Sequence, residues 1–185
     1  MKRTFIAIDI VPSPRLIEDY DLVRYRLRTE RINWVPAGQL HITLNFLGDT
    51  DEESLLQIGQ TIERTVNTKT NFELTLRSLG VFRSLREPRV IWIGCDKCPG
   101  IEHIKKELDH SLTIFGFEPE DRDYSPHLTL GRVKEMRQQN QLSQLITLYK
   151  EVAFQKQIVD KITMYESKLT PAGPEYLPLY VFLLK

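Results

Sequence analysis

Hydrophobic and polar positions along the chain follow two periods, one typical of strands and one typical of helices. Short apolar runs predict strands at 4–10, 41–47, 72–82, 89–95, 127–133, 158–165 and 177–184. Apolar residues at helical spacing predict four helices, with core faces formed by Leu16, Tyr20, Val23 and Leu27, by Leu55, Ile58, Ile62 and Val66, by Ile101, Ile104, Leu108 and Phe115, and by Leu142, Leu145, Ile146 and Tyr149. Because hairpin-like spacings are mixed with helices, this order predicts an α+β fold with mostly antiparallel pairing.

Helix ends and turns carry their own signals. Ser13 followed by Pro14 is typical of an N-cap and a first helical position. Residues 50–53 match a capping box before the second helix. Residues 84–88 favour a hairpin connection, and residues 171–174 favour a loop before the last strand. No low-complexity stretch or linker separates these elements, so a single domain is expected.

Composition narrows the class of protein. The 185 residues contain 25 Lys and Arg against 25 Asp and Glu, so the net charge is zero and a uniformly basic surface for long nucleic acid is excluded. No apolar run reaches the roughly 20 residues that span a bilayer. The apolar run near the start meets Asp9 too early for a signal peptide, and two cysteines make no disulfide framework. A soluble cytoplasmic protein is expected.

The most informative feature is a tetrapeptide that occurs twice, His41-Ile42-Thr43-Leu44 and His127-Leu128-Thr129-Leu130. With four histidines in the chain, this repetition has a chance probability on the order of one in a thousand. Strand alternation places His41, Thr43 and Asn45 on one face and Ile42, Leu44 and Phe46 on the other, and in the second strand His127, Thr129 and Gly131 opposite Leu128 and Leu130. Each strand therefore presents an imidazole beside a hydroxyl, about 6–7 Å apart.

This pairing of groups suits the cleavage of a phosphodiester. Imidazole titrates near neutrality, so one ring can accept a proton from the attacking oxygen while the other donates one to the leaving oxygen. Threonine hydroxyls can donate hydrogen bonds to the non-bridging phosphate oxygens. The alternative is that both histidines are merely half-exposed residues on the faces of a sheet.

Flanking residues extend these motifs into a resemblance to a known family. Segments 3–8, 33–48, 125–132, 165–169 and 173–176 together resemble the 2H phosphoesterase superfamily, and within it the bacterial and archaeal RNA 2′,3′-cyclic phosphodiesterases, also described as 2′-5′ RNA ligases. The resemblance implies a bilobal α+β fold with two mostly antiparallel sheets lining a central cleft and helices outside. It implies one domain over residues 1–185 with two pseudo-symmetric lobes, each supplying one His-x-Thr-x motif.

The resemblance also implies an activity, namely opening of 2′,3′-cyclic phosphates at RNA ends to 2′-phosphomonoesters without metal or cofactor. It implies His41 as proton donor and His127 as proton acceptor, an order that the sequence alone leaves open. Run in reverse, the same site could form a 2′-5′ linkage. The expected partners are RNA or oligonucleotide ends and no membrane, and the chain is expected to be a monomer.

Three residues are candidates for binding the phosphate. Arg132 would supply a positive charge, and Thr43 and Thr129 would supply hydroxyl donors. Strict alternation, however, places position 132 opposite His127, so Arg132 reaches the site only if the strand bulges or ends there. Otherwise it is a surface charge. Three aromatic residues could stack on a base or simply pack in the protein: Trp34, Tyr124 and Tyr176.

The sequence leaves other functions open. Cys95 and Cys98 with His103 resemble the start of a zinc knuckle, but a fourth ligand is missing at the expected spacing, and two unconnected cysteines are the simpler interpretation. Another 2H phosphoesterase, acting on 2′-5′ oligonucleotides or on ADP-ribose cyclic phosphate, would share the same chemistry. An RNA-end binding protein without turnover would not need two histidines, and a metal phosphatase would need carboxylates near the motifs.

Overall fold

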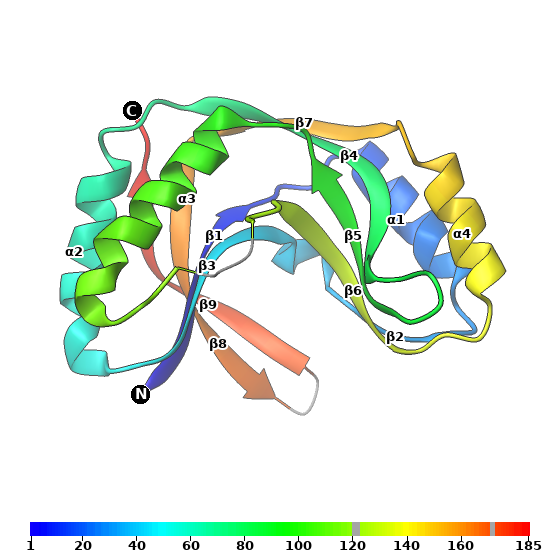
Figure 1. Ribbon diagram of the computed structural model, residues 1–185, viewed down its shortest axis with the longest axis horizontal. Coiled ribbons are helices and arrows are strands. Elements are labelled where there is room, and N and C mark those ends of the chain that lie inside the picture. The colour runs from blue at the N-terminus through cyan, green and yellow to red at the C-terminus, as the bar shows by residue number, and fades with distance from the viewer. Residues whose placement is uncertain (120–122, 171–172) are drawn as a thin grey trace.

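The computed structural model describes residues 1–119, 123–170 and 173–185. Its strands are β1 (Lys2–Asp9), β2 (Arg31–Trp34), β3 (His41–Thr50), β4 (Phe72–Arg83), β5 (Pro88–Cys95), β6 (His127–Glu135), β7 (Ala153–Val159), β8 (Lys161–Thr170) and β9 (Gly173–Leu183). Its α-helices are α1 (Pro14–Arg26), α2 (Leu55–Val66), α3 (Pro99–Leu112) and α4 (Gln139–Leu148). Figure 1 shows a strongly curled sheet, with α2 and α3 side by side at one end and α1 and α4 at the other.

Within these described ranges, the strands form one nine-stranded sheet in the order β7-β4-β5-β6-β3-β1-β8-β9, with β2 also paired to β6. Neighbouring strands are antiparallel throughout, so the predicted α+β class and pairing are confirmed. The two sheets that the resemblance implies are continuous here, because β3 and β6 are joined through the single residue pair Ile42 and Leu128. This narrow junction brings the two tetrapeptides together.

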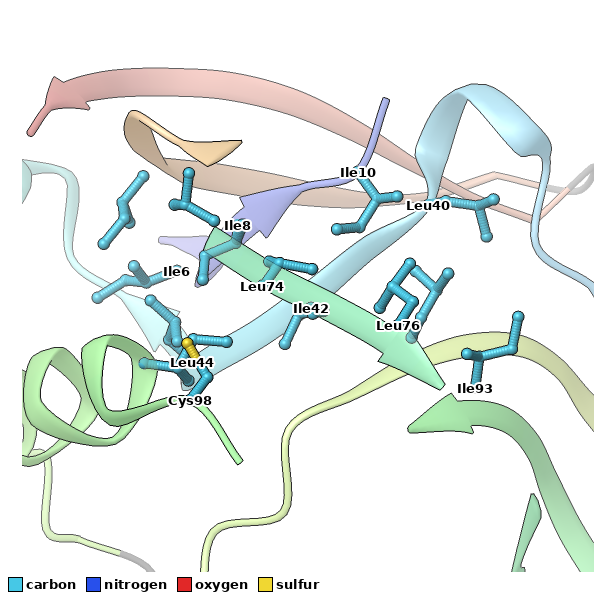
Figure 2. Packing of buried hydrophobic residues seen from close by; sticks show 14 of the residues in the cluster. Ile6, Ile8, Ile10, Leu40, Ile42, Leu44, Leu74, Leu76, Ile93 and Cys98 are labelled. Atoms are coloured by element: carbon cyan, nitrogen blue, oxygen red, sulfur yellow. The ribbon is translucent and has the colours of Figure 1, made fainter. Parts of the chain in front are cut away.

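The predicted amphipathic stripes form the core. Ile6 and Ile42 have no exposed surface, and the same holds for Leu16, Ile58 and Ile101 in the first three helices. Figure 2 shows side chains of β1, β3, β4 and β5 gathered in one cluster. Each such aliphatic side chain contributes roughly 1.5–3 kcal/mol when it leaves water. Burial therefore fixes which face of β3 and β6 is turned inward and leaves the opposite face available.

The predicted N-terminus of the first helix is confirmed, and the capping box predicted before the second helix is wrong. The Ser13 hydroxyl accepts a hydrogen bond from the Leu16 amide at 3.2 Å, as an N-cap does. Thr50, by contrast, lies at the end of β3, and its hydroxyl lies 2.7 Å from that of Thr4 in β1. Helix α2 begins at Leu55 after a short 3₁₀ turn. The capping-box pattern fails here because cross-strand pairing already uses the threonine.

The strand predicted at 158–165 is in fact the junction of two strands, β7 and β8. The pattern missed β7 because polar residues interrupt its apolar ones. Gln155 and Gln157 accept hydrogen bonds from the backbone amides of Ser13 and Val11, at 2.7 and 3.1 Å, and so fasten the connection between β1 and α1. Of the loop predicted at 171–174, residues 171–172 lie outside the described residues, and the prediction is wrong for Gly173 and Pro174, which begin β9 and pair with β8. In the part of the chain that the structure describes, no helix is long and apolar enough to cross a membrane.

Candidate active site

The two tetrapeptides lie at the point where β3 and β6 meet. In the antiparallel pair centred on Ile42 and Leu128, position 41 lies opposite position 129, and position 43 lies opposite position 127. Ile42 and Leu128 are fully buried, whereas the histidines and threonines are half-buried on the other side of their strands. We call this side, which carries His41, Thr43, His127 and Thr129, the motif face.

Both imidazoles are held by the same contact. Nδ1 of His41 lies 2.7 Å from the carbonyl oxygen of Gln39, and Nδ1 of His127 lies 2.8 Å from that of Ser125. A carbonyl oxygen can only accept, so Nδ1 is the protonated nitrogen of each neutral ring. Nε2 of each ring is then the atom that can take up or release a proton.

Aromatic rings support each imidazole. The ring centroid of His41 lies 5.1 Å from that of Phe5 and 5.1 Å from that of Tyr176, the latter edge-on. The ring of His127 meets Phe82 edge-on at 4.6 Å. Both histidines therefore have restricted ring orientations as well as a fixed tautomer.

The environment of the two rings favours their neutral forms. Burial lowers the pKa of His41 and of His127, and the positive charge of Arg132 lowers the pKa of both rings further. The hydrogen bonds to Gln39 and Ser125 act in the opposite direction. For His41, Asp9 also raises the pKa, while the charge of His127 lowers it.

Arg132 reaches the motif face because β6 bulges. Thr129 pairs with Trp92 and Gly131 pairs with Ile91 on β5, so Leu130 is an extra residue in β6. After the bulge, Val133 is buried and Arg132 is exposed. Strict alternation would have turned Arg132 away from His127. The sequence therefore required a bulge or a strand end near Arg132, and the structure has the bulge.

Gly131 permits this bulge. A Cβ at position 131 would lie 2.8 Å from Ile32 Cγ2 and 2.9 Å from Trp34 Cε3, closer than real side chains approach. Trp34 also packs edge-on against Tyr20 at 6.0 Å. This aromatic residue thus supports the bulge through its contact with Gly131.

A second bulge, in β3, contradicts the predicted faces of Asn45 and Phe46. Thr43 pairs with Ala7 and Asn45 pairs with Ile6, so Leu44 is the extra residue. Phe46 is consequently 63% exposed and lies 6.3 Å from the Phe5 ring, on the motif face. Asn45 turns the other way and donates to Asp109 of α3 at 2.6 Å. The prediction failed because it assumed uninterrupted alternation.

Of the remaining aromatic candidates, Tyr176 lies at the site, edge-on to His41. Tyr124 instead ties the segment before β6 to β3, because its hydroxyl donates to the Thr43 carbonyl oxygen at 2.9 Å. Burial raises the pKa of Tyr124, which keeps this donor protonated. Sequence reasoning missed Phe5 and Phe82, which reach the histidines from strands distant in the chain.

The cysteines and His103 do not assemble into a metal site. Cys98 is 6% exposed in the core, and burial raises the pKa of the Cys95 thiol to about 12. His103 lies 2.8 Å from Glu107, its neighbour on α3. Across residues 1–119, 123–170 and 173–185, no three His, Cys, Asp or Glu side chains are grouped so that they could hold a metal ion.

Comparison with known proteins identifies the family. Residues 12–170 match the model of the 2′-5′ RNA ligase superfamily. The chain is 34% identical over 184 residues to an RNA 2′,3′-cyclic phosphodiesterase of Methanothermobacter thermautotrophicus, with 98% of each chain covered. It is 37% identical over 174 residues to a protein of the same name from Methanocaldococcus jannaschii, with 94% of this chain and 96% of the relative covered.

Solved structures agree. TT0787 of Thermus thermophilus has a TM-score of 0.80 at 25% identity, with 98% of this chain and 97% of that chain covered. E. coli LigT complexed with 3′-AMP has a TM-score of 0.75 at 26% identity, with 100% and 98% covered. The matched segment contains both tetrapeptides and most of the sheet that carries them. The chain therefore belongs to the 2′-5′ RNA ligase superfamily.

Proposed function

We infer that this chain is an RNA 2′,3′-cyclic phosphodiesterase that opens a cyclic phosphate at an RNA end to a 2′-phosphomonoester. The observation that carries this conclusion is the pair His41 and His127, held alike on one face with Nε2 available and with Arg132 acting on both. The relatives that match nearly the full chain bear this name. LigT, which shares the fold, has been solved with the nucleotide 3′-AMP.

The arrangement supports a one-step displacement. His127 Nε2 takes a proton from water as the water oxygen attacks phosphorus. The bond from phosphorus to the 3′ oxygen breaks, and His41 Nε2 gives its proton to that oxygen. The hydroxyls of Thr43 and Thr129 donate to the non-bridging oxygens, and the Arg132 guanidinium balances the negative charge that builds up. If a 5′ hydroxyl attacks phosphorus in place of water, the same proton transfers would form a 2′-5′ linkage and free the 3′ oxygen.

We also propose that the chain works as a monomer in the cytoplasm, as a single domain with two pseudo-symmetric halves and without metal or cofactor. Both histidines come from one chain, so no partner subunit is needed to complete the site. Light scattering during gel filtration tests the oligomeric state. A mass near the 21.7 kDa of one chain is expected, and a stable dimer would contradict the proposal.

A turnover assay separates this function from its alternatives. Purified protein is incubated with a 2′,3′-cyclic nucleotide, a 2′-5′ dinucleotide and ADP-ribose 1″,2″-cyclic phosphate, each with and without EDTA. Cleavage of the 2′,3′-cyclic nucleotide to the 2′-phosphate, unaffected by EDTA, is expected. Preference for another substrate would indicate a different 2H phosphoesterase. Binding without turnover would indicate an RNA-end binding protein, and loss of activity in EDTA that metal restores would indicate a metal-dependent enzyme.

A further inference from the structure

The two histidines differ in the residue that faces each from the neighbouring outer strand. His41 is paired with Asp9 of β1, whereas His127 is paired with Gly94 of β5. Directly opposite residues of an antiparallel pair point to the same face, with Cβ atoms about 4.5–5.5 Å apart. A carboxylate therefore lies beside one imidazole and no side chain lies at the corresponding position beside the other.

Packing leaves little room for a side chain at position 94. A Cβ at Gly94 would lie 3.0 Å from the Arg77 carbonyl oxygen and 3.3 Å from Trp92 Cζ3. Both contacts are tighter than nine in ten real Cβ contacts. The environment of His127 is therefore built without a carboxylate at this position, and the difference between the two sites belongs to the fold.

The Asp9 carboxylate is fixed by two neutral donors. The hydroxyl of Thr163 donates to Asp9 Oδ2 at 2.9 Å, and the hydroxyl of Tyr165 donates to Oδ1 at 2.5 Å. Hydrogen bonds from hydroxyls stabilise the ionised carboxylate without cancelling its charge. The ring of Tyr165 stacks on Phe5 at 5.2 Å, and Phe5 in turn contacts the His41 ring. The carboxylate thus belongs to the same packed cluster as the imidazole.

Other titratable and charged groups also act on His41. Tyr176 of β9 packs against its ring, and His127 and Arg132 of β6 act through their charges. Asp9 itself lines a cavity of about 420 Å³ together with Lys156, Asp160 and Lys161. Among the groups of the described chain whose charge acts on His41, Asp9 is the one carboxylate, and it opposes the effects of burial and of Arg132.

We propose that Asp9 is a positioning residue that makes His41, and not His127, the proton donor. Its fixed negative charge favours the imidazolium form of His41, while the Gly94 position leaves His127 free to stay neutral and accept a proton. The order of donor and acceptor, which the two identical motifs leave open, is then set by the strands beside them. The kinetic part of this inference rests on the proposed function, whereas the coupling between Asp9 and His41 does not.

Titration of the imidazole signals by NMR tests the coupling without any substrate. Asp9→Asn removes the charge and keeps an acceptor oxygen for one of the two hydroxyl donors, Thr163 or Tyr165. It should lower the titration midpoint of His41 by about 0.5–2 pH units and leave that of His127 nearly unchanged. Asp49→Asn is the matched control, because Asp49 is exposed at the other end of the same strand pair, opposite Arg3. Asp9→Ser supplies a second neutral variant if Asp9→Asn does not fold.

The pH profile of kcat/KM tests the assignment. An acid must be protonated, so Asp9→Asn should move the alkaline limb to lower pH by the same amount and leave the acid limb in place. Asp9→Glu should restore most of the shift, and a p-nitrophenyl leaving group, which needs no proton, should remove most of the loss. An unchanged His41 midpoint in the neutral variants, or movement of the acid limb alone, would overturn the proposal. Absence of turnover in the wild type would refute the proposed function, while the NMR result would still decide the coupling.

Discussion

His41 and His127 are related by the antiparallel junction between β3 and β6, and each donates from Nδ1 to the carbonyl oxygen two residues earlier in the chain. Each histidine also lies opposite the threonine of the other tetrapeptide. The short sequence His-x-Thr, placed on two antiparallel strands, thus gathers two imidazoles and two hydroxyls on the motif face.

The two histidines should act as a pair. His41→Ala and His127→Ala should each lower turnover at least about 100-fold, and the double variant should lose much less than the product of the two single losses. Steady-state kinetics on a 2′,3′-cyclic nucleotide measure both effects. A substrate with a p-nitrophenyl leaving group should rescue His41→Ala and not His127→Ala. The opposite rescue would reverse donor and acceptor, and strictly multiplicative losses would argue against a shared step.

The activity should have a bell-shaped pH dependence that lies on the acid side. Burial and Arg132 lower the pKa of both histidines below the usual 6.5. Activity rises as His127 loses its proton on the acid limb and falls as His41 loses its proton on the alkaline limb, so both limbs of kcat/KM should lie below about 6.5. The limbs are macroscopic values of the coupled pair. A flat profile, or an optimum well above pH 7, would contradict this assignment.

The motif threonines should contribute to the transition state and little to the fold. Thr43→Val and Thr129→Val keep the β-branched shape but delete a donor, so each should lower kcat by about 10²–10³-fold, or about 2.7–4 kcal/mol. Thr4→Val is the control, because the Thr4 hydroxyl is buried against Thr50 on the core side. This control should lower the free energy of unfolding and leave kcat unchanged. Equal kinetics in all three variants would remove the threonines from the mechanism.

Sequence periodicity predicted the elements that bury an apolar face. The predictions of a buried helix face from Leu16 to Leu27 and of a buried strand face at Ile42 are confirmed. Burial on one side of an element imposes a fixed period on its sequence. The same reasoning could not locate Phe5, Asp9 or Tyr165 at the site. Phe5 and Asp9 lie beside His41, and Tyr165 contacts both of them, through pairing between distant strands. That register depends on the whole sheet.

The two bulges show where alternation gives unreliable faces. In β6, Gly131 follows the extra residue, and a glycine inside a strand is a recognised signal of a bulge. The bulge that turns Arg132 toward the motif face thus has a signal in the sequence, whereas the condition placed on Arg132 follows from strand alternation alone. In β3 the extra residue is Leu44, which gives no such signal, and the faces of Asn45 and Phe46 were predicted wrongly.

Tyr124 should support the geometry of the first motif. The hydroxyl of Tyr124 provides a partner for the Thr43 carbonyl oxygen, so Tyr124→Phe should lower the free energy of unfolding by about 1–2 kcal/mol and kcat by about threefold to tenfold. Tyr20→Phe is a matched control, because it removes the same kind of bond, to the Val35 carbonyl oxygen. The two variants should lose similar free energy of unfolding, and Tyr124→Phe should lose more kcat than Tyr20→Phe. An equal loss of kcat in both variants would mean that Tyr124 has a structural role alone.

Arg132 should act both on the phosphate and on the histidines. Arg132→Ala should lower kcat/KM by about 10–100-fold, since a guanidinium that binds a phosphate makes charge-assisted hydrogen bonds. It should also move both limbs of the pH profile to higher pH, because Arg132 lowers the pKa of both rings.

Arg132→Lys keeps the charge but loses the planar fork, so the limbs should stay near their wild-type positions while part of the loss in kcat/KM remains. Lys134→Ala, an exposed position farther along β6, serves as the control for removing a positive charge from this strand. Limbs that do not move in Arg132→Ala would mean that the bulge does not bring its charge close enough to the two imidazoles to affect their protonation.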